Sequence, residues 1–185
     1  MLMNKKLALT ILKAEIEANT SLPLKKSNLV FGEGSPDCMV MFIGEAPGKN
    51  EDLEKRPFVG RSGQLINKNL EKIGWKREDV YITNIVKKRP PLNRDPSEKE
   101  IKSFEPYLTK QIEIIDPRII VPLGRFATNY FLSDAKISLA QGKISEVSGR
   151  KIFPMFHPAA ALRGTKVMKQ FEASFRELGH IVDNF

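Results

Sequence analysis

The sequence predicts an α/β fold, a three-layer α/β/α sandwich with a central, mainly parallel four-stranded sheet. Short apolar runs alternate with longer amphipathic segments, a pattern typical of repeated strand–helix units that build a parallel sheet. The short runs are apolar almost throughout, as expected for strands that are covered on both faces. Strands are expected at about residues 38–43, 79–86, 119–123 and 151–156.

The segments between these runs carry helix signals. Gly74 is a suitable C-cap for one helix, and Ser97 is a good N-cap for another. Pro90, Pro91 and Pro96 force a loop before Ser97, because proline cannot continue a regular element. Residues 134–150 are expected to form an irregular or hairpin excursion. Helices are expected at about residues 4–18, 61–73, 98–115, 124–132 and 166–178.

Length and composition indicate one globular domain over residues 1–185. The chain is 41% hydrophobic and shows no internal repeat or long linker. No stretch approaches the ~20 apolar residues that a membrane span needs. Charged residues within the first twenty positions interrupt the apolar core that a signal peptide requires. We therefore expect a cytoplasmic, unprocessed protein that acts as a monomer and has no membrane partner.

The formal net charge of +8 favours an anionic partner, nucleic acid first. On charge alone, a solvated surface that happens to be basic is an equal alternative. The positive residues are clustered, however. Lys87–Arg89 directly follow the second predicted strand, while Arg56, Arg61 and Arg163 lie near the polar motifs described next. This clustering favours nucleic acid.

The cysteine count excludes several kinds of site. Cys38 is the only cysteine, so the chain cannot form an internal disulfide or a thiolate cluster. His157 and His180 are the only histidines, which also excludes zinc sites built from cysteine and histidine. We expect no metal and no cofactor, and we expect Cys38 to be a buried structural thiol.

A glycine- and proline-containing turn, Gly44–Gly48, follows the first predicted strand. Open α/β sheets bind their ligands at this end of the strands. Asn84 lies in the second apolar run and His157 follows the last, so one cleft can collect all three segments. The turn is not a phosphate-binding P-loop, which needs four residues between its glycines and Ser or Thr after the lysine. The dinucleotide fingerprint G-x-G-x-x-G is also absent.

Five segments of the sequence carry recognisable motifs: Gly44–Gly48, Arg56–Arg61, Tyr81–Asn84 with Lys87 and Arg89–Pro91, Asn93–Pro96 and His157–Ala160. In their order and approximate spacing they resemble the motifs of the family 4 uracil-DNA glycosylases. The resemblance extends from about residue 20 to residue 178. It implies the fold of that family and a monofunctional DNA glycosylase. Such an enzyme flips uracil out of DNA, hydrolyses its N-glycosidic bond and thereby initiates base excision repair.

The resemblance implies a uracil pocket. Phe58 would stack on the flipped pyrimidine, because aromatic faces stack on bases. The amide of Asn84 would pair with the carbonyl and ring N–H of uracil and would clash with the reversed pattern of cytosine. Glu51 would crowd the C5 position and exclude thymine; the alternative is that it simply belongs to the charged run from Asn50 to Arg56. The backbone carbonyl of Ala46 would help to hold water.

The resemblance also implies two catalytic residues. His157 would face uracil O2 and stabilise the negative charge that develops on the base; whether its imidazole is neutral or cationic is left open. Glu45 would orient the attacking water or stabilise the positive charge that develops on the sugar. Other uracil-DNA glycosylases have a water-activating aspartate where this chain has Ala46.

Two short segments are expected to contact DNA. In the first, small residues permit close approach to backbone phosphates. The second would fill the gap left by the flipped base. It has Ala161 where family members often have leucine, so either the wedge is weaker or Leu162 carries that role. The residues are Gly60, Ser62, Gly63, Ala161, Leu162 and Arg163.

The chain departs from the family at an iron–sulfur cluster. Most members bind a four-iron, four-sulfur cluster through four cysteines, and the matching positions here are Asn19, Leu22, Lys88 and Phe104. None of these is a thiolate, so no such cluster can be held. We expect Leu22 and Phe104 to fill the vacated space. No basic, histidine-containing insertion precedes Pro96, so turnover is expected rather than a covalent adduct with DNA.

Two other functions compete with uracil excision. The chain could be a non-catalytic binder of damaged or single-stranded DNA that retains a uracil pocket; the intact set of Glu45, Phe58, Asn84 and His157 argues against this. It could also be a small-molecule enzyme such as a nucleoside hydrolase, which the basic charge disfavours. The sequence leaves open the preference for single- or double-stranded DNA and the activity on other deaminated bases.

Overall fold

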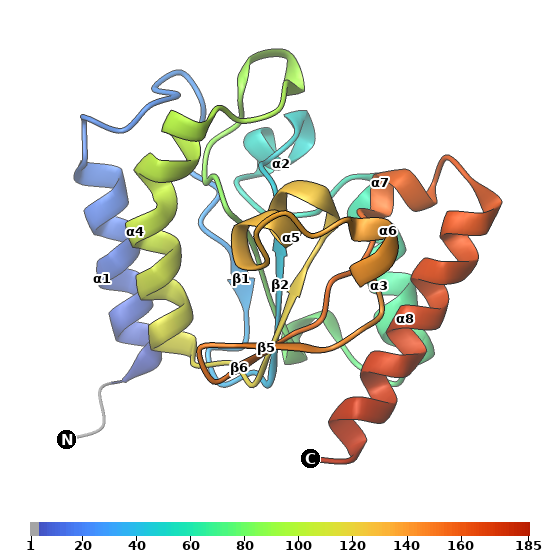
Figure 1. Ribbon diagram of the computed structural model, residues 1–185. Helices are drawn as coiled ribbons and strands as arrows, with labels where there is room; N and C mark the ends of the chain where they lie inside the picture. The colour runs from blue at the N-terminus through green and yellow to red at the C-terminus, as the bar shows by residue number, and fades with distance from the viewer. Residues whose placement is uncertain (1–3) are drawn as a thin grey trace.

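The computed structural model describes residues 4–185, and its centre is a six-stranded sheet (Figure 1). The strand order is β1-β3-β2-β4-β6-β5. Strands β3, β2, β4 and β6 are parallel, whereas β1 and β5 pair antiparallel at the two edges. The strands are β1 (Glu33–Gly34), β2 (Val40–Gly44), β3 (Tyr81–Asn84), β4 (Ile119–Pro122), β5 (Ser145–Val147) and β6 (Arg150–Ile152).

The four predicted strands are the parallel part of this sheet, and the prediction is corrected at both edges. Strand β1 has two residues and β5 has three, which is too short for a recognisable hydrophobic period. The last predicted strand is also shorter than expected, because β6 ends at Ile152. Beyond Pro154, which has no N–H to donate, the chain rejoins β4 through an isolated bridge between Leu123 and Met155.

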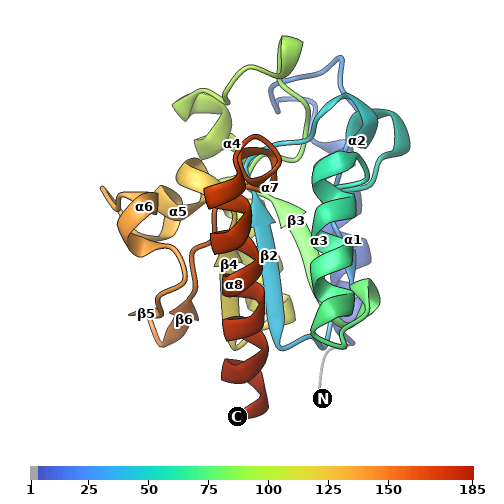
Figure 2. The ribbon, with the colours of Figure 1, turned by 90° about the vertical axis from the view of Figure 1, so that its right-hand side faces the viewer.

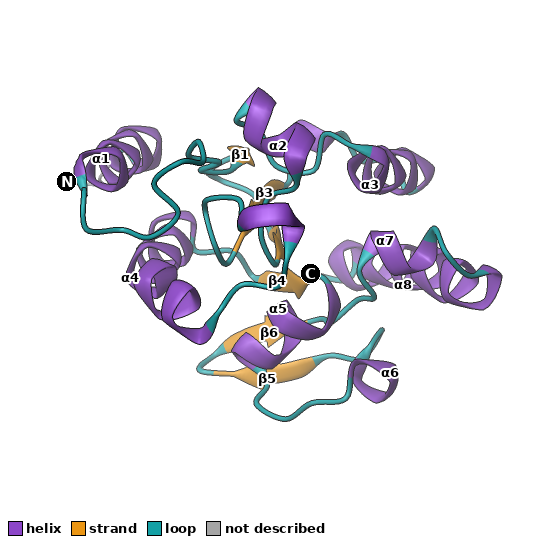
Figure 3. Cartoon of the chain, turned by 90° about the horizontal axis from the view of Figure 1, so that it is seen from above, coloured by secondary structure: helices purple, strands orange, loops and turns teal. Residues whose placement is uncertain are grey.

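Helices cover both faces of the sheet, which gives three layers (Figures 2 and 3). Helices α1 and α4 lie on one face, and α3 and α8 lie on the other. The α-helices are α1 (Lys5–Ala18), α2 (Lys49–Glu54), α3 (Arg61–Lys72), α4 (Glu98–Ile115), α5 (Gly124–Phe131), α6 (Ile137–Ala140), α7 (Pro158–Ala161) and α8 (Thr165–Asp183). Two 3-10 helices complete the elements, η1 (Arg77–Asp79) and η2 (Pro91–Asn93).

The start of α4 illustrates how local sequence sets an element. Ser97 caps the helix through its side chain, which accepts a hydrogen bond from the N–H of Glu100. The Glu100 carboxylate accepts from the N–H of Ser97 in return, at 2.7 Å. This reciprocal capping box satisfies two N–H groups that would otherwise lack partners at the helix start. The predicted cap at Ser97 is therefore confirmed.

Each central strand contributes to two separate hydrophobic cores. Met41 and Ile43 pack against the α1 and α4 side, whereas Val40 and Phe42 pack against the α3 and α8 side. Alternate side chains of a strand point to opposite faces, so a strand covered on both faces must be apolar at every position. This arrangement explains the continuous apolar runs of the sequence. Within residues 4–185, no helix is long and apolar enough to cross a membrane.

The N-terminal segment is held to α4 by packing and by side-chain hydrogen bonds, among them those from Lys110 Nζ to the Glu15 carboxylate at 3.0 Å and from Lys5 Nζ to the Ile115 carbonyl at 2.8 Å. Leu22 and Phe104 are both buried in the core on the α1 and α4 side, as expected. The Asn19 amide donates to the Tyr107 hydroxyl at 2.6 Å. These residues do not fit an iron–sulfur cluster, because none supplies a sulfur ligand and apolar side chains fill the space. Cys38 is buried elsewhere in this core, and burial raises the pKa of its thiol to about 11.

Candidate active site

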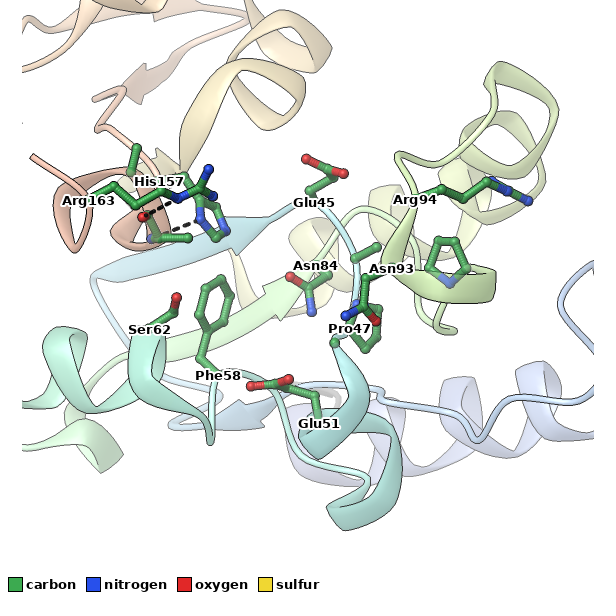
Figure 4. Close-up of a pocket in the computed structure, with 15 residues that line it drawn as sticks. Glu45, Pro47, Glu51, Phe58, Ser62, Asn84, Asn93, Arg94, His157 and Arg163 are labelled. Carbon is green, nitrogen blue, oxygen red and sulfur yellow. Dashed lines mark hydrogen bonds between the residues drawn. The ribbon is translucent and has the colours of Figure 1, made fainter.

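A cavity of about 530 Å³ opens at the carboxyl ends of β2 and β3 (Figure 4). Four separate segments line it: the turn after β2 with the start of α2, the loop that enters α3, the end of β3 with the loop after it, and the segment that begins at His157. Parallel strands bring these segments together, because their carboxyl ends meet at the same edge of the sheet. The cleft predicted from sequence is therefore present.

Most of the predicted site residues line this cavity. Gly60, Gly63, Ala161 and Leu162 are not among the lining residues. The predicted residues that line it are Glu45, Ala46, Glu51, Phe58, Ser62, Asn84, His157 and Arg163. The lining also includes residues that the sequence reasoning did not assign to the pocket, among them Pro47, Gly48, Pro90, Asn93 and Arg94.

Because Gly44 has no side chain, it leaves space for the side chains of Asn84 and Phe58. It pairs with Asn84 across the parallel β2–β3 ladder. A Cβ atom placed on Gly44 would lie 2.4 Å from the Asn84 Oδ1 atom and 2.4 Å from the Phe58 Cζ atom. Any other residue at position 44 would therefore displace the amide or the ring. The sequence marked Gly44 as part of a turn, but this steric role depends on strand register, which the sequence does not reveal.

Asn84 is buried at the end of β3, with 1% of its surface exposed. Among the residues that the structure describes, no donor reaches its Oδ1 atom. A buried acceptor without a partner costs about 1–3 kcal/mol, so such an atom in a cavity wall indicates a ligand donor. Figure 4 places the amide in the middle of the site, with Phe58 on one side and Pro47 on the other.

Phe58 forms an aromatic wall of the cavity. Its ring centroid lies 5.9 Å from that of His157, with the two planes tilted by 37°. Its backbone adopts a φ of +49°, in the left-handed region that non-glycine residues rarely occupy. Contacts on either side hold it there. A Cβ atom on Gly63 would lie 1.5 Å from the Phe58 carbonyl oxygen, so α3 can approach this loop only because Gly63 has no side chain.

Glu51 fixes the same loop from α2. One carboxylate oxygen accepts hydrogen bonds from the N–H groups of Val59 and Gly60, each at 3.0 Å. The Gly60 N–H is therefore occupied within the protein, and Gly63 is buried against Phe58. Of the three small residues expected near phosphates, Ser62 is the one whose side chain reaches the cavity.

His157 is held by its own helix start. It is the N-cap of α7, and its Nδ1 atom accepts a hydrogen bond from the N–H of Ala159 at 3.2 Å. Burial, together with repulsion by Arg163, lowers the pKa of His157 to about 4, while Glu51 opposes the change. The imidazole is therefore neutral near pH 7. Because Nδ1 accepts, the proton resides on Nε2, which leaves that atom free to donate into the cavity.

Glu45 lies directly after β2, at the mouth of the cavity. Hydrogen bonds from Ile85 and Val86 to the carbonyls of Gly44 and Glu45, at 2.9 and 3.0 Å, continue the parallel ladder and fix this turn. Burial raises the pKa of the Glu45 carboxyl to about 7; the nearby Asp95 adds to the rise and Arg125 opposes it. About half of these carboxyls are ionised at pH 7 as a result.

The segment that is predicted to fill the gap left by the flipped base has a buried part and an exposed part. Ala161 is 2% exposed and packs in the core on the α3 and α8 side, which leaves almost none of its surface for DNA. Leu162 is partly buried beside it, and Arg163 is exposed at the cavity, with its Nε atom donating to the Ala159 carbonyl at 3.2 Å. Leu162 and Arg163 are therefore the residues of this segment that solvent can reach.

One part of the predicted basic surface is corrected. Lys87 is completely buried rather than exposed. Its Nζ atom donates to Thr83 Oγ1 at 2.6 Å and to Gln111 Oε1 at 2.5 Å. Burial holds the pKa of this lysine well below its usual range. Lys87 thus fastens β3 to α4 and cannot contact phosphates, a role that a lysine in a run of basic residues does not indicate.

Comparison with known proteins agrees with this geometry. The family model described as the uracil DNA glycosylase superfamily matches residues 31–179. A type-4 uracil-DNA glycosylase of Saccharolobus solfataricus is 46% identical over 165 residues, which cover 83% of this chain and 76% of the relative. Its counterpart from Archaeoglobus fulgidus is 42% identical, with 84% of this chain and 83% of the relative covered.

A third relative has similar coverage. The type-4 uracil-DNA glycosylase of Thermotoga maritima is 42% identical over 158 residues, which cover 83% of this chain and 82% of the relative. The matched region contains every segment that lines the cavity. The single cysteine, Cys38, distinguishes the chain from the four-cysteine pattern expected of this family. The chain belongs to the uracil-DNA glycosylase superfamily and, within it, to the type-4 enzymes, as a member that lacks the cysteines for an iron–sulfur cluster.

Proposed function

We propose that this protein is a monofunctional uracil-DNA glycosylase, which hydrolyses the bond between uracil and deoxyribose in DNA and so initiates base excision repair. Family membership supports the reaction, and one observation in the site carries the choice of base. The buried Oδ1 atom of Asn84 has no donor among the described residues, and it lies in a cavity wall beside an aromatic ring. An extruded base with a ring N–H supplies the missing donor.

Uracil matches both ends of the Asn84 amide. Oδ1 accepts from uracil N3–H, and Nδ2 donates to uracil O4. Cytosine presents an unprotonated N3 and an amino group at the same positions, so both contacts become unfavourable. A site with buried polar groups rejects such a mismatch strongly. Phe58 stacks on the base, and Glu51 narrows the space beside C5, where thymine carries a methyl group.

His157 stabilises the departing base. As the N1–C1′ bond breaks, its electron pair passes to uracil, and negative charge spreads to O2. A neutral imidazole whose Nε2–H points into the cavity can donate to this oxygen. Removal of one such donor typically lowers the rate by a factor of about 10²–10³. The hydrogen bond from Ala159 supports this role, because it keeps the proton on Nε2.

Glu45 and Ala46 act on the sugar side of the bond. The ionised Glu45 carboxylate orients a water molecule towards C1′ or offsets the positive charge that develops on the sugar. The Ala46 carbonyl helps to hold that water. Water oxygen bonds to C1′ as uracil leaves, which produces an abasic site and free uracil. No lysine is among the described residues that line the cavity, which supports hydrolysis without a Schiff base.

We also propose that the protein acts as a monomer on uracil in single- or double-stranded DNA, with Ser62, Leu162 and Arg163 at the DNA-facing rim. The net charge of +8 supports binding to a polyanion. Binding should weaken steeply with added salt, because phosphate contacts release counterions.

The test measures uracil release from a labelled oligonucleotide, followed by alkali to cleave abasic sites. We expect product from the wild type and at least a hundredfold less from Asn84→Asp, which cannot donate to O4. Asn184→Asp makes the same chemical change at the end of α8, away from the cavity, and should leave the rate unchanged. DNA binding without product would support the non-catalytic binder, and preference for free deoxyuridine would support a small-molecule hydrolase.

A further inference from the structure

The loop between β3 and α4 exposes an apolar side chain beside the cavity. Leu92 is 94% exposed, more than any other large hydrophobic residue in the part of the chain that the structure describes. It lies in η2, and its neighbours Pro90, Asn93 and Arg94 line the cavity. In Figures 1 and 2 this green segment, which precedes α4, extends beyond α2 and α7.

The backbone of this loop is also unfavourable for leucine. Leu92 has a φ of +56° and Asn93 a φ of +55°. Asparagine tolerates the left-handed region, but leucine rarely adopts it, because its Cβ atom crowds the following carbonyl. A glycine at position 92 would remove both the strain and the exposed apolar surface. The fold therefore keeps an apolar side chain in water at a conformational cost, which indicates a use outside the folded monomer.

Contacts within the protein make the loop rigid. The Arg89 Nε atom donates to Asn93 Oδ1 at 2.6 Å, which closes the turn around Leu92. Arg94 donates through both terminal nitrogens to the Glu100 carboxylate, at 2.8 and 2.7 Å, which ties the turn to the start of α4. Pro91 restricts the remaining backbone freedom. Leu92 is thus presented by a fixed support rather than by a flexible tip.

We propose that Leu92 is a wedge that enters the base stack of double-stranded DNA beside the extruded nucleotide. The inference rests on the proposed uracil excision, which requires base flipping. Figure 4 shows Asn93 and Arg94 on one side of the cavity and Arg163 on the other, so the loop that carries Leu92 lies on the rim opposite the segment that carries Leu162. Apolar side chains inserted between base steps partly unstack them and stabilise distorted DNA. Transfer of the leucine side chain from water into the base stack lowers the free energy of the complex, because apolar surface is buried.

Leu92 on one rim of the cavity compensates for the burial of Ala161 on the other rim. With Ala161 packed in the core, the segment after α7 offers Leu162, which is itself partly buried, as its apolar contact. Leu92 supplies a larger accessible apolar surface on the opposite rim. The wedge matters for duplex DNA, in which the neighbouring bases are paired and stacked, and it matters little for single strands, whose bases separate at lower cost.

The test compares Leu92→Ala with Leu139→Ala, which truncates a leucine of α6 that is 66% exposed and is not among the cavity residues. We expect Leu92→Ala to lower kcat/KM on duplex uracil DNA about tenfold, as the loss of one buried leucine contact predicts. Its kcat/KM on the single-stranded substrate should change less than about twofold, and Leu139→Ala should match the wild type on both. Equal losses on the two substrates, or no loss on the duplex, would overturn the proposal.

A second measurement does not depend on catalysis. A duplex carries 2-aminopurine next to a uracil nucleotide with a 2′-fluoro group, which resists cleavage. The fluorescence of 2-aminopurine rises when its stacking is disrupted, so the wild type and Leu139→Ala should raise it and saturating Leu92→Ala should not. If Leu92→Ala raises the fluorescence as much as the wild type does, the proposal that Leu92 enters the base stack is refuted. The exposed leucine would then have another use, such as docking a protein. Absence of uracil release by the wild type would refute the proposed function, while this fluorescence would still decide the role of Leu92.

Discussion

The pH dependence of catalysis offers a direct test of Glu45. Burial raises the pKa of this carboxyl to about 7, and its proposed role requires the ionised form. The ionised fraction is then about one half at pH 7, one tenth at pH 6 and one hundredth at pH 5. We expect kcat/KM for uracil release to fall about fivefold from pH 7 to pH 6 and about tenfold from pH 6 to pH 5. An unburied glutamate, with a pKa near 4.3, would keep the rate constant over this range.

His157 does not titrate in the same window. Its pKa of about 4 lies below the range of the assay, so the imidazole stays neutral from about pH 5 upwards and keeps its Nε2 proton. The assay measures single-turnover release from single-stranded uracil DNA between about pH 5 and pH 9. Glu45→Gln should lower the rate and remove its dependence on pH. Glu146→Gln, in β5, makes the same change away from the cavity and should keep the wild-type profile.

Stability provides a second readout with the opposite sign. The folded protein holds the Glu45 proton up to about pH 7, whereas the unfolded chain releases it near its ordinary pKa. The unfolded state therefore binds fewer protons in this window, and stability decreases as pH rises through it. The difference in free energy of unfolding between Glu45→Gln and the wild type should therefore shift in favour of the variant when the pH is raised from 5 to 8. A wild-type rate that is flat between pH 5 and pH 7, or a pH limb that survives Glu45→Gln, would refute the reasoning.

Three further substitutions test the scaffold of the site. Gly44→Ala places a methyl group 2.4 Å from Asn84 Oδ1 and Phe58 Cζ, so uracil release should fall at least tenfold; a normal rate in the same assay would contradict the steric role. Phe104→Ala should cost about 3–5 kcal/mol in urea unfolding, and an unchanged midpoint would show that packing does not replace the cluster. Lys87→Met removes a lysine whose pKa is depressed by burial. In the wild type, the unfolded chain protonates Lys87 more readily than the folded protein does. The free energy of unfolding of the wild type should therefore drop as pH falls from about 10 to 7, and that of Lys87→Met should drop less.

The sequence predicted the parallel sheet because its signal is local. Strands covered on both faces need apolar residues at consecutive positions, as Val40, Met41 and Phe42 illustrate. Edge strand β1 gives no such signal: Glu33 and Gly34 form it only because they lie against Ile82 and Tyr81. Short elements of this kind depend on distant partners rather than on their own hydrophobic period, so sequence alone could not place them.

The candidate site, too, was only partly predictable from the sequence. Motif residues indicated which side chains gather, but their environment was not visible in the sequence. The neutral state of His157 follows from burial and from repulsion by Arg163, and both depend on the folded arrangement. Lys87 shows the opposite error: a basic run suggested a surface charge, whereas tertiary packing buries this lysine completely against Gln111.

The proposed mechanism assigns recognition of the base and stabilisation of the reaction to groups that different elements support. Asn84 is fixed by the β2–β3 ladder, and the Phe58 loop is fixed by the Glu51 carboxylate. His157 depends instead on the start of α7, through the N–H of Ala159. Because different elements support these groups, a change at Asn84 should alter which base is accepted and leave the ionisation of His157 unchanged. Loss of His157 should slow release while the preference for uracil over cytosine persists, since the Asn84 amide, which is proposed to distinguish the two bases, keeps its position.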